Sequence, residues 1–199
     1  MPVFLADPPQ WLYLLLGGCL VVTGALAAQK QDRRAAFPFG IAALLLLLVF
    51  LLDRFFESPR EEAVRRTFMM GLAADAKNPD AFAEHVADKV SVQTGKDQTK
   101  TATRDELKKS QFWGMLKQFN VSVTTSGYSR DDVNVIDDNT IEIGFIAKGE
   151  AKGFAEGKAI PIYCRATFGR QSDGSFKLTA FKAFEFINRN EPFIIPNFP

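Results

Sequence analysis

The sequence is poor in the residues that most often build catalytic and metal centres. It has one histidine, His85, and two cysteines, Cys19 and Cys164, among 199 residues. A single histidine excludes a metal site with two or more imidazole ligands. Cys19 lies in an apolar run and Cys164 in a predicted strand, so one soluble domain cannot close a disulfide between them. No catalytic or cofactor motif stands above background, and we predict neither a metal nor a cofactor.

An excess of charge of one sign is also absent. The chain holds 24 basic and 23 acidic residues, which gives a formal net charge of +1. A nucleic-acid-binding domain would carry a basic stripe or patch, so no nucleic acid partner is predicted. The aspartates of SRDDVNVIDDNT, which include Asp131, lack the spacing and the closing glutamate of an EF-hand loop. We interpret them as solvated turn acids.

The first quarter of the chain does have long stretches without charge. Residues 11–28 contain no ionisable group except the Tyr13 phenol, and residues 35–52 form a second stretch of the same length. About 18 residues at 1.5 Å rise nearly cross a hydrocarbon core of roughly 30 Å. Because the connection between the stretches is short and polar, the sequence predicts a transmembrane hairpin over residues 1–53, with the lipid bilayer as a partner.

A secretory signal peptide is the alternative to the first span. Residues 25–27, Ala-Leu-Ala, offer a small-residue cleavage site after an apolar core. Signal peptides begin with positive charge, whereas the residues before Trp11 carry Asp7 and no lysine or arginine. The hairpin is therefore the preferred reading.

Basic residues flank the predicted spans and bear on their orientation. The connecting loop contains three: Lys30, Arg33 and Arg34. By the positive-inside rule the loop is then cytoplasmic and the main domain exoplasmic or periplasmic. Four arginines after the second span favour the opposite, cytoplasmic placement: Arg54, Arg60, Arg65 and Arg66. We predict the exoplasmic or periplasmic placement of the main domain, with the cytoplasmic placement as the alternative.

The polar remainder, residues 54–187, opens with helix signals. The first helix has three capping residues: Ser58, Pro59 and Glu61. An apolar stripe follows at four-residue spacing: Val64, Phe68 and Leu72. A second short helix begins at Asn78 and Pro79 and runs to about residue 86. A capping box at Thr103 and Glu106 opens a third helix over residues 104–119.

Alternation of apolar and polar residues predicts strands elsewhere. One lies at DKVSVQT, and four longer ones cover residues 120–135, 139–152, 157–170 and 175–187. Turn residues join the long strands: Asp138 and Asn139, then 153–157, then 172–174. Short links of this kind predict an antiparallel meander.

This element order resembles that of the nuclear-transport-factor-2-like superfamily, which includes ketosteroid isomerase, scytalone dehydratase and the SnoaL cyclases. The resemblance covers residues 58–187 and includes the pieces NPDAFAEHVADKVSV and DGSFKLTAFKAFEF. It implies an α+β fold in which a curved antiparallel sheet wraps around three helices to form a cone with a pocket at its wide end. Fold resemblance alone does not specify an activity.

Ketosteroid isomerases use a carboxylate base with an oxyanion hole that includes a tyrosine. The first helix of the polar domain has no tyrosine, which departs from that pattern. His85 is a structural or surface residue in the favoured interpretation and a general base in the alternative. If the pocket is open, we expect four residues to line it: Phe68, Leu72, Trp113 and Tyr163. A cone filled by phenylalanine and methionine is the other alternative.

Both faces of the last strand are apolar. At period two, Leu178 shares a face with Phe184, while Phe181 and Ile187 share the other. A one-sided sheet would leave the second face polar, so a cover is implied: a homodimer partner, a membrane-complex partner, or the tail 188–199 folded back. The predicted interaction face consists of Phe181, Ile187, Phe193 and Ile194.

These observations predict a membrane-tethered, non-enzymatic module that binds a ligand or assembles with a protein. Membrane-anchored members of the superfamily, such as assembly subunits of type IV secretion machines, make the tether reasonable, although they use one span. The alternative is a small-molecule isomerase or dehydratase that acts in the cone pocket.

Overall fold

The chain forms two compact units in the computed structural model, Met1–Pro59 and Arg60–Pro199. The structure describes residues 10–30, 33–55, 58–96, 98–128, 132–151 and 159–198. Three features of the sequence analysis lie outside these ranges: the turn at 153–157, Asp131 and the segment before Gln10.

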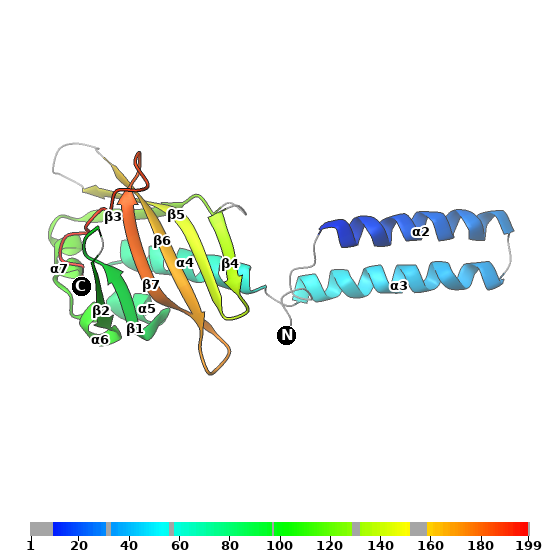
Figure 1. Cartoon of the computed structure of the whole chain (residues 1–199), viewed down its shortest axis with the longest axis horizontal. Coiled ribbons are helices and arrows are strands. Elements are labelled where there is room, and N and C mark those ends of the chain that lie inside the picture. The colour runs from blue at the N-terminus through cyan, green and yellow to red at the C-terminus, as the bar shows by residue number, and fades with distance from the viewer. Residues whose placement is uncertain are drawn as a thin grey trace. The chain divides into compact units, whose positions relative to one another are not determined.

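The first unit consists of α2 (Gln10–Lys30) and α3 (Arg33–Phe55), which lie side by side and antiparallel (Figure 1). The helices approach closely at Gly24, where a Cβ atom would lie 3.3 Å from the Phe39 ring. One helix of the described residues, Trp11–Gln29, is long and apolar enough to cross a bilayer. The apolar part of α3, Ala36–Leu52, is shorter. The second predicted span is not shown and stays a prediction.

The second unit begins with α4 (Pro59–Asp75) and α5 (Pro79–Ala83), followed by β1 (Val86–Gln93) and β2 (Thr99–Thr103). Two more helices, α6 and α7, precede the remaining strands and span Arg104–Lys108 and Gln111–Gln118. The other five strands are β3 (Val121–Ser126), β4 (Val133–Asp137), β5 (Thr140–Ala151), β6 (Ile160–Arg170) and β7 (Phe176–Glu185).

The seven strands form one curved sheet with the order β2-β1-β7-β6-β5-β3, and β4 also pairs with β5 (Figure 1). The predicted antiparallel meander is confirmed for β5, β6 and β7. The sheet is mixed, however, because β1 pairs with β7 in parallel. This α+β architecture confirms the predicted class and corrects the prediction of a purely antiparallel sheet.

Helix α4 begins at Pro59 as predicted but buries a different face. Its buried residues are mostly small: Ala63, Thr67, Met70, Gly71, Ala73 and Ala74. A Cβ atom at Gly71 would lie only 2.5 Å from Oγ1 of Thr125 on β3. The small face thus permits an approach that a bulky stripe would prevent, and Phe68 and Leu72 remain 46% and 49% exposed.

Two predicted elements are each divided in the structure. The helix over 104–119 breaks at Ser110, whose side chain caps α7 by accepting a hydrogen bond from the Phe112 amide at 3.2 Å. The strand over 120–135 is two strands, β3 and β4, which pair with opposite halves of β5. The Ser110 cap divides the helix, and the change of pairing partner along β5 divides the strand. Neither feature breaks the apolar pattern of the sequence, so the pattern predicted one continuous element in each case.

The faces of β7 also differ from the period-two prediction, because the strand contains a bulge. Phe168 on β6 pairs with Leu178, whereas Thr167 pairs with Ala180, which leaves Thr179 as an extra residue. Its hydroxyl donates to the Thr167 carbonyl at 3.1 Å. The inserted residue shifts the alternation, so Leu178 and Phe181 face the same side.

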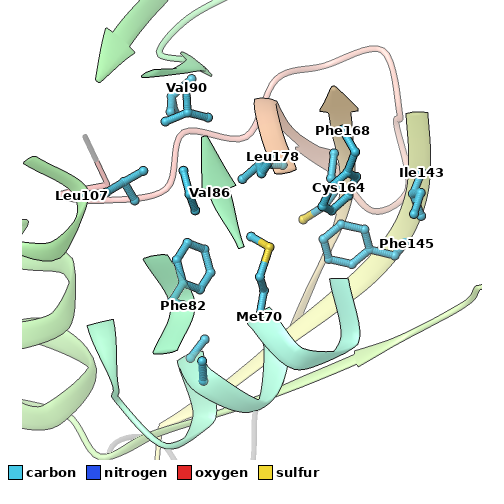
Figure 2. Close-up of a cluster of buried hydrophobic side chains, with 14 of the residues drawn as sticks. Met70, Phe82, Val86, Val90, Leu107, Ile143, Phe145, Cys164, Phe168 and Leu178 are labelled. Carbon is cyan, nitrogen blue, oxygen red and sulfur yellow. The ribbon is translucent and has the colours of Figure 1, made fainter. Parts of the chain in front are cut away.

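The hydrophobic core lies between α4 and the sheet. Figure 2 shows Met70 of α4 among Phe82, Phe145 and Cys164, with Leu178 nearby. The most completely buried large side chains are Phe168, Phe176, Leu107, Ile141, Ile143 and Leu178, each under 2% exposed. Ile141, Phe168, Phe176 and Leu178 are neighbours in the register of β5, β6 and β7 and fill one end of the cone, which we call the narrow end.

Candidate functional site

The other end of the cone, the wide end, contains a cavity of about 590 Å³. It lies within the range of small-molecule sites, roughly 300–1,000 Å³. The end of β5, the start of β6 and helix α7 contribute to its lining, as does the tail after β7. An interior filled by phenylalanine and methionine is therefore not what the structure has at this end.

Small side chains leave this space open. Seven lining residues are glycine, alanine or cysteine on α4, β5 and β6: Gly71, Ala74, Ala147, Gly149, Ala151, Cys164 and Ala166. Larger apolar residues complete the wall, among them Phe82, Phe112, Phe145 and Ile162. A cavity lined in this way favours an apolar occupant, because burial of apolar surface is the dominant favourable term there.

The tail forms one wall of the cavity. It returns along β7, where the Phe193 amide donates to the Ala183 carbonyl at 2.8 Å. It then reaches α7, where the Ser110 hydroxyl donates to the Asn197 carbonyl at 3.1 Å. The Phe198 ring lies 5.3 Å from Phe112 and 5.5 Å from Phe181, measured between ring centroids. The tail thus covers the wide end from within the same chain.

Few groups in the described lining can move a proton. Lys148 and Cys164 are its ionisable residues. Burial raises the pKa of the Cys164 thiol far above its usual range, which keeps it protonated and unreactive. The Thr67 hydroxyl is occupied, since it donates to the Ala63 carbonyl at 2.8 Å. No carboxylate, imidazole or phenol of the described residues lines the cavity.

The four residues predicted to line a pocket are not brought together. Phe68 and Leu72 are exposed on α4. Trp113 is buried behind the wall, and its indole donates to the Leu107 carbonyl at 2.8 Å. Its ring packs edge-on against Phe82 and Phe112, which do line the cavity. Tyr163 lies on the opposite face of the sheet from Cys164, over Gly144, where a Cβ atom would collide with the phenol.

The predicted interaction face is divided in two. Phe181 and Phe193 line the cavity. Ile187 and Ile194 are 95% and 58% exposed. The sequence contained one signal for this wall of the cavity: an apolar tail that could cover the apolar face of the last strand. It offered none for the bulge that turns Phe181 inward.

His85 lies outside the cavity lining. Its Nδ1 atom is 3.5 Å from a guanidinium nitrogen of Arg66, which itself pairs with Glu62 at 2.8 Å. Burial, and then the Arg66 charge, lower the pKa of His85. A neutral histidine in this setting belongs to the packing of α4 against the end of α5, as the favoured interpretation has it.

Comparison with known proteins identifies the fold. No protein-family model matches the chain, and no curated protein matches it. A solved nuclear-transport-factor-2-like protein with a cystatin-like fold from Novosphingobium aromaticivorans has a TM-score of 0.53 and 17% identity, over 72% of this chain and 88% of its own.

Two further structures are similar. A cystatin-like domain of unknown function from Nostoc punctiforme has a TM-score of 0.50 and 11% identity, over 63% of this chain and 77% of its own. A protein from Novosphingobium aromaticivorans DSM 12444 carries the provisional name scytalone dehydratase. It has a TM-score of 0.49 and 15% identity, over 68% of this chain and 91% of its own. At these identities the likeness shows the fold alone, and the predicted fold is confirmed: the second unit has a cystatin-like fold, as the first two of these solved proteins do.

Proposed function

We propose that the protein is a membrane-tethered module that binds an apolar small molecule in the wide end of the cone. The observation that carries this proposal is the cavity of about 590 Å³ with an almost wholly apolar lining. A water molecule occupies about 30 Å³ in the liquid and a methylene group is of similar size, so the space suits a ligand of roughly 20 heavy atoms.

The chemistry of the lining favours binding over catalysis. An isomerase or dehydratase needs a general base or acid within hydrogen-bond reach of its substrate. The described lining offers Lys148, which is exposed, and Cys164, whose thiol stays protonated. The oxyanion tyrosine that ketosteroid isomerases use has no counterpart there. These features support the non-enzymatic function.

The tether is proposed to be the α2–α3 hairpin. Apolar side chains cover the outer surface of α2, with Leu14 77% and Val21 71% exposed. Such surfaces are stable in lipid and unfavourable in water. We expect the chain to stay with the membrane fraction after alkaline carbonate extraction. Release into the supernatant would contradict the tether without bearing on the cavity.

Ligand binding can be tested by energy transfer from Trp113 to cis-parinaric acid, a fluorescent acyl chain. The full chain carries a second tryptophan, Trp11, so the measurement uses the Trp11→Phe protein. Trp113 contacts two lining residues, which places it within transfer range of a bound chain. We expect saturable quenching of Trp113.

A matched pair of variants makes this test specific. Ala147 lines the cavity, and Ala147→Phe should fill part of it and weaken binding at least about tenfold, the equivalent of roughly 1.4 kcal/mol. Ala76 is exposed beyond α4, so Ala76→Phe adds the same group without entering the cavity and should bind normally. Equal binding by both variants would show that the probe lies in lipid and would overturn the proposal.

A further inference from the structure

The turn after β7 exposes large apolar side chains. Ile187 is 95% exposed and Phe186 40% exposed. Ile160, at the start of the neighbouring strand β6, is 60% exposed. The register, in which Ile162 pairs with Glu185, places the start of β6 beside the end of β7. Three apolar side chains are therefore presented to solvent at one end of the sheet.

Basic side chains adjoin this end on the face of the sheet opposite the cavity. Arg165 and Lys182 are direct cross-strand partners on β6 and β7. The Arg165 guanidinium lies 5.4 Å from the Phe184 ring centroid, and that of Arg189 lies 4.2 Å from the centroid of Tyr163. None of the three cations forms an ion pair with a residue that the structure describes.

Like charges directly opposite each other destabilise a sheet unless an anion lies nearby. Two glutamates are close in sequence, Glu185 and Glu191, and their backbones bond to each other at 2.9 Å. Glu185 alternates with Phe184 along β7 and so projects to the other side of the sheet. Among the described residues, Glu142 and Glu150 of β5 share the face of the three cations but form no ion pair with them, so the three charges are available to an external anion.

We propose that this basic-apolar surface, formed by Ile160, Phe186, Ile187, Arg165, Lys182 and Arg189, docks on an anionic lipid bilayer. Exposed aliphatic and aromatic groups flanked by lysine and arginine are typical of surfaces that enter the headgroup region. A second copy fits poorly, since a two-fold contact would set the cations against their own equivalents.

This docking extends the proposed function, and it uses the tether only to hold the domain near lipid. Ile160 belongs both to the basic-apolar surface and to the cavity lining. Docking therefore brings the rim of the cavity to the acyl-chain boundary, from which an apolar ligand can enter without crossing water. The ligand class this favours is a membrane-soluble lipid rather than a free metabolite.

The test labels Ile187→Cys with the environment-sensitive dye NBD in the full chain. The background is Cys19→Ser, and Cys164 is buried and stays unlabelled. The protein is reconstituted in vesicles of phosphatidylcholine alone or of an equimolar mixture with phosphatidylglycerol. We expect a blue-shifted, brighter emission in the anionic vesicles. The triple variant Arg165→Gln, Lys182→Gln and Arg189→Gln should lose this blue shift. Each removed charge should lower the docking equilibrium constant roughly fivefold.

Ile136 provides a matched label site, since it is 56% exposed on β4, which pairs with Thr140–Ile143 of β5, whereas Ile160 pairs with Gly149 near the other end of that strand. Its emission should be the same in both vesicles. Parinaric acid binding by the glutamine variant would verify that its domain is folded. Three outcomes overturn the proposal: equal emission from the two label sites, a shift that follows protein density instead of lipid charge, and a shift produced only by soluble polyglutamate. The second indicates a second copy and the third an acidic protein, and all three leave cavity binding and the tether intact.

Discussion

The two ends of the cone use similar residues and differ in what they enclose. At the narrow end Phe168, Phe176 and Leu178 are each no more than 1% exposed. At the wide end Phe112, Phe145 and Ile162 line a cavity of about 590 Å³. Apolar composition alone therefore does not decide whether a region is solid or hollow. The difference comes from glycine and alanine on the facing strands and from a tail that bridges the gap.

The largest effect should come from removing a ring at the narrow end. Phe168→Ala would leave a void in a packed core, so we expect a loss of about 3–5 kcal/mol in the free energy of unfolding. Urea denaturation in mild detergent, followed by Trp113 fluorescence in the Trp11→Phe protein, measures it. A loss below about 1 kcal/mol would show that the narrow end is not the solid half.

Removal of a ring at the wide end should cost less. Phe198 is half-buried beside existing empty space, and its contacts are two ring pairs with Phe112 and Phe181. Aromatic pairs contribute roughly 0.5–1.5 kcal/mol each, so the loss of these two should lower the free energy of unfolding by about 1–3 kcal/mol in Phe198→Ala. The same denaturation applies. A loss as large as that of Phe168→Ala would erase the contrast between the ends.

Enlarging a side chain distinguishes the ends in the opposite direction. Ala147→Leu adds three carbon atoms that the cavity can hold, so the free energy of unfolding should change by less than about 1 kcal/mol. Ala63→Leu, at a fully buried position on α4, is the control and should cost about 1–3 kcal/mol through overpacking. Comparable losses for both would mean that the wide end is packed.

The smallest effect concerns His85, which lies beside Arg66. Because burial and Arg66 lower its pKa, the unfolded chain binds a proton near pH 6.5 that the folded chain does not. The free energy of unfolding should then decrease as the pH falls through 6.5 and level off below the lowered pKa. Above pH 6.5 the neutral histidine makes its full contribution to stability. His85→Gln should flatten this part of the pH profile. An unchanged profile would contradict the assignment.

The sequence predicted elements whose signals are local. Ser58 with Pro59 marked the start of α4, the Asn78 side chain accepts from the Ala81 amide, and the Thr103 and Glu106 capping box is present. The fold class followed from their order. The site depended on non-local facts: which face of α4 fits against Thr125, and where β7 gains a residue. An apolar stripe shows which residues of a helix or strand can be buried. It does not show which other element packs against them.

Edge strand β2 illustrates the same limit from the polar side. Its residues Thr99–Thr103 are exposed except Ala102, so no alternation of apolar residues announced it. Backbone pairing with β1 holds it in place. A strand stabilised by its ladder alone leaves little trace in side-chain pattern.

The extra residue Thr179 sets the side of every later position in β7. If Thr179 paired with Thr167 in place of Ala180, each of those positions would change sides: Lys182 would enter the apolar interior, while Phe181 and Ala183 would turn to water. Deleting Thr179 would place Ala180 directly after Leu178 and keep every later side chain on its present side. We therefore expect this deletion to be tolerated better than the insertion of one residue after Ala180, which would bring a charged side chain into the cavity.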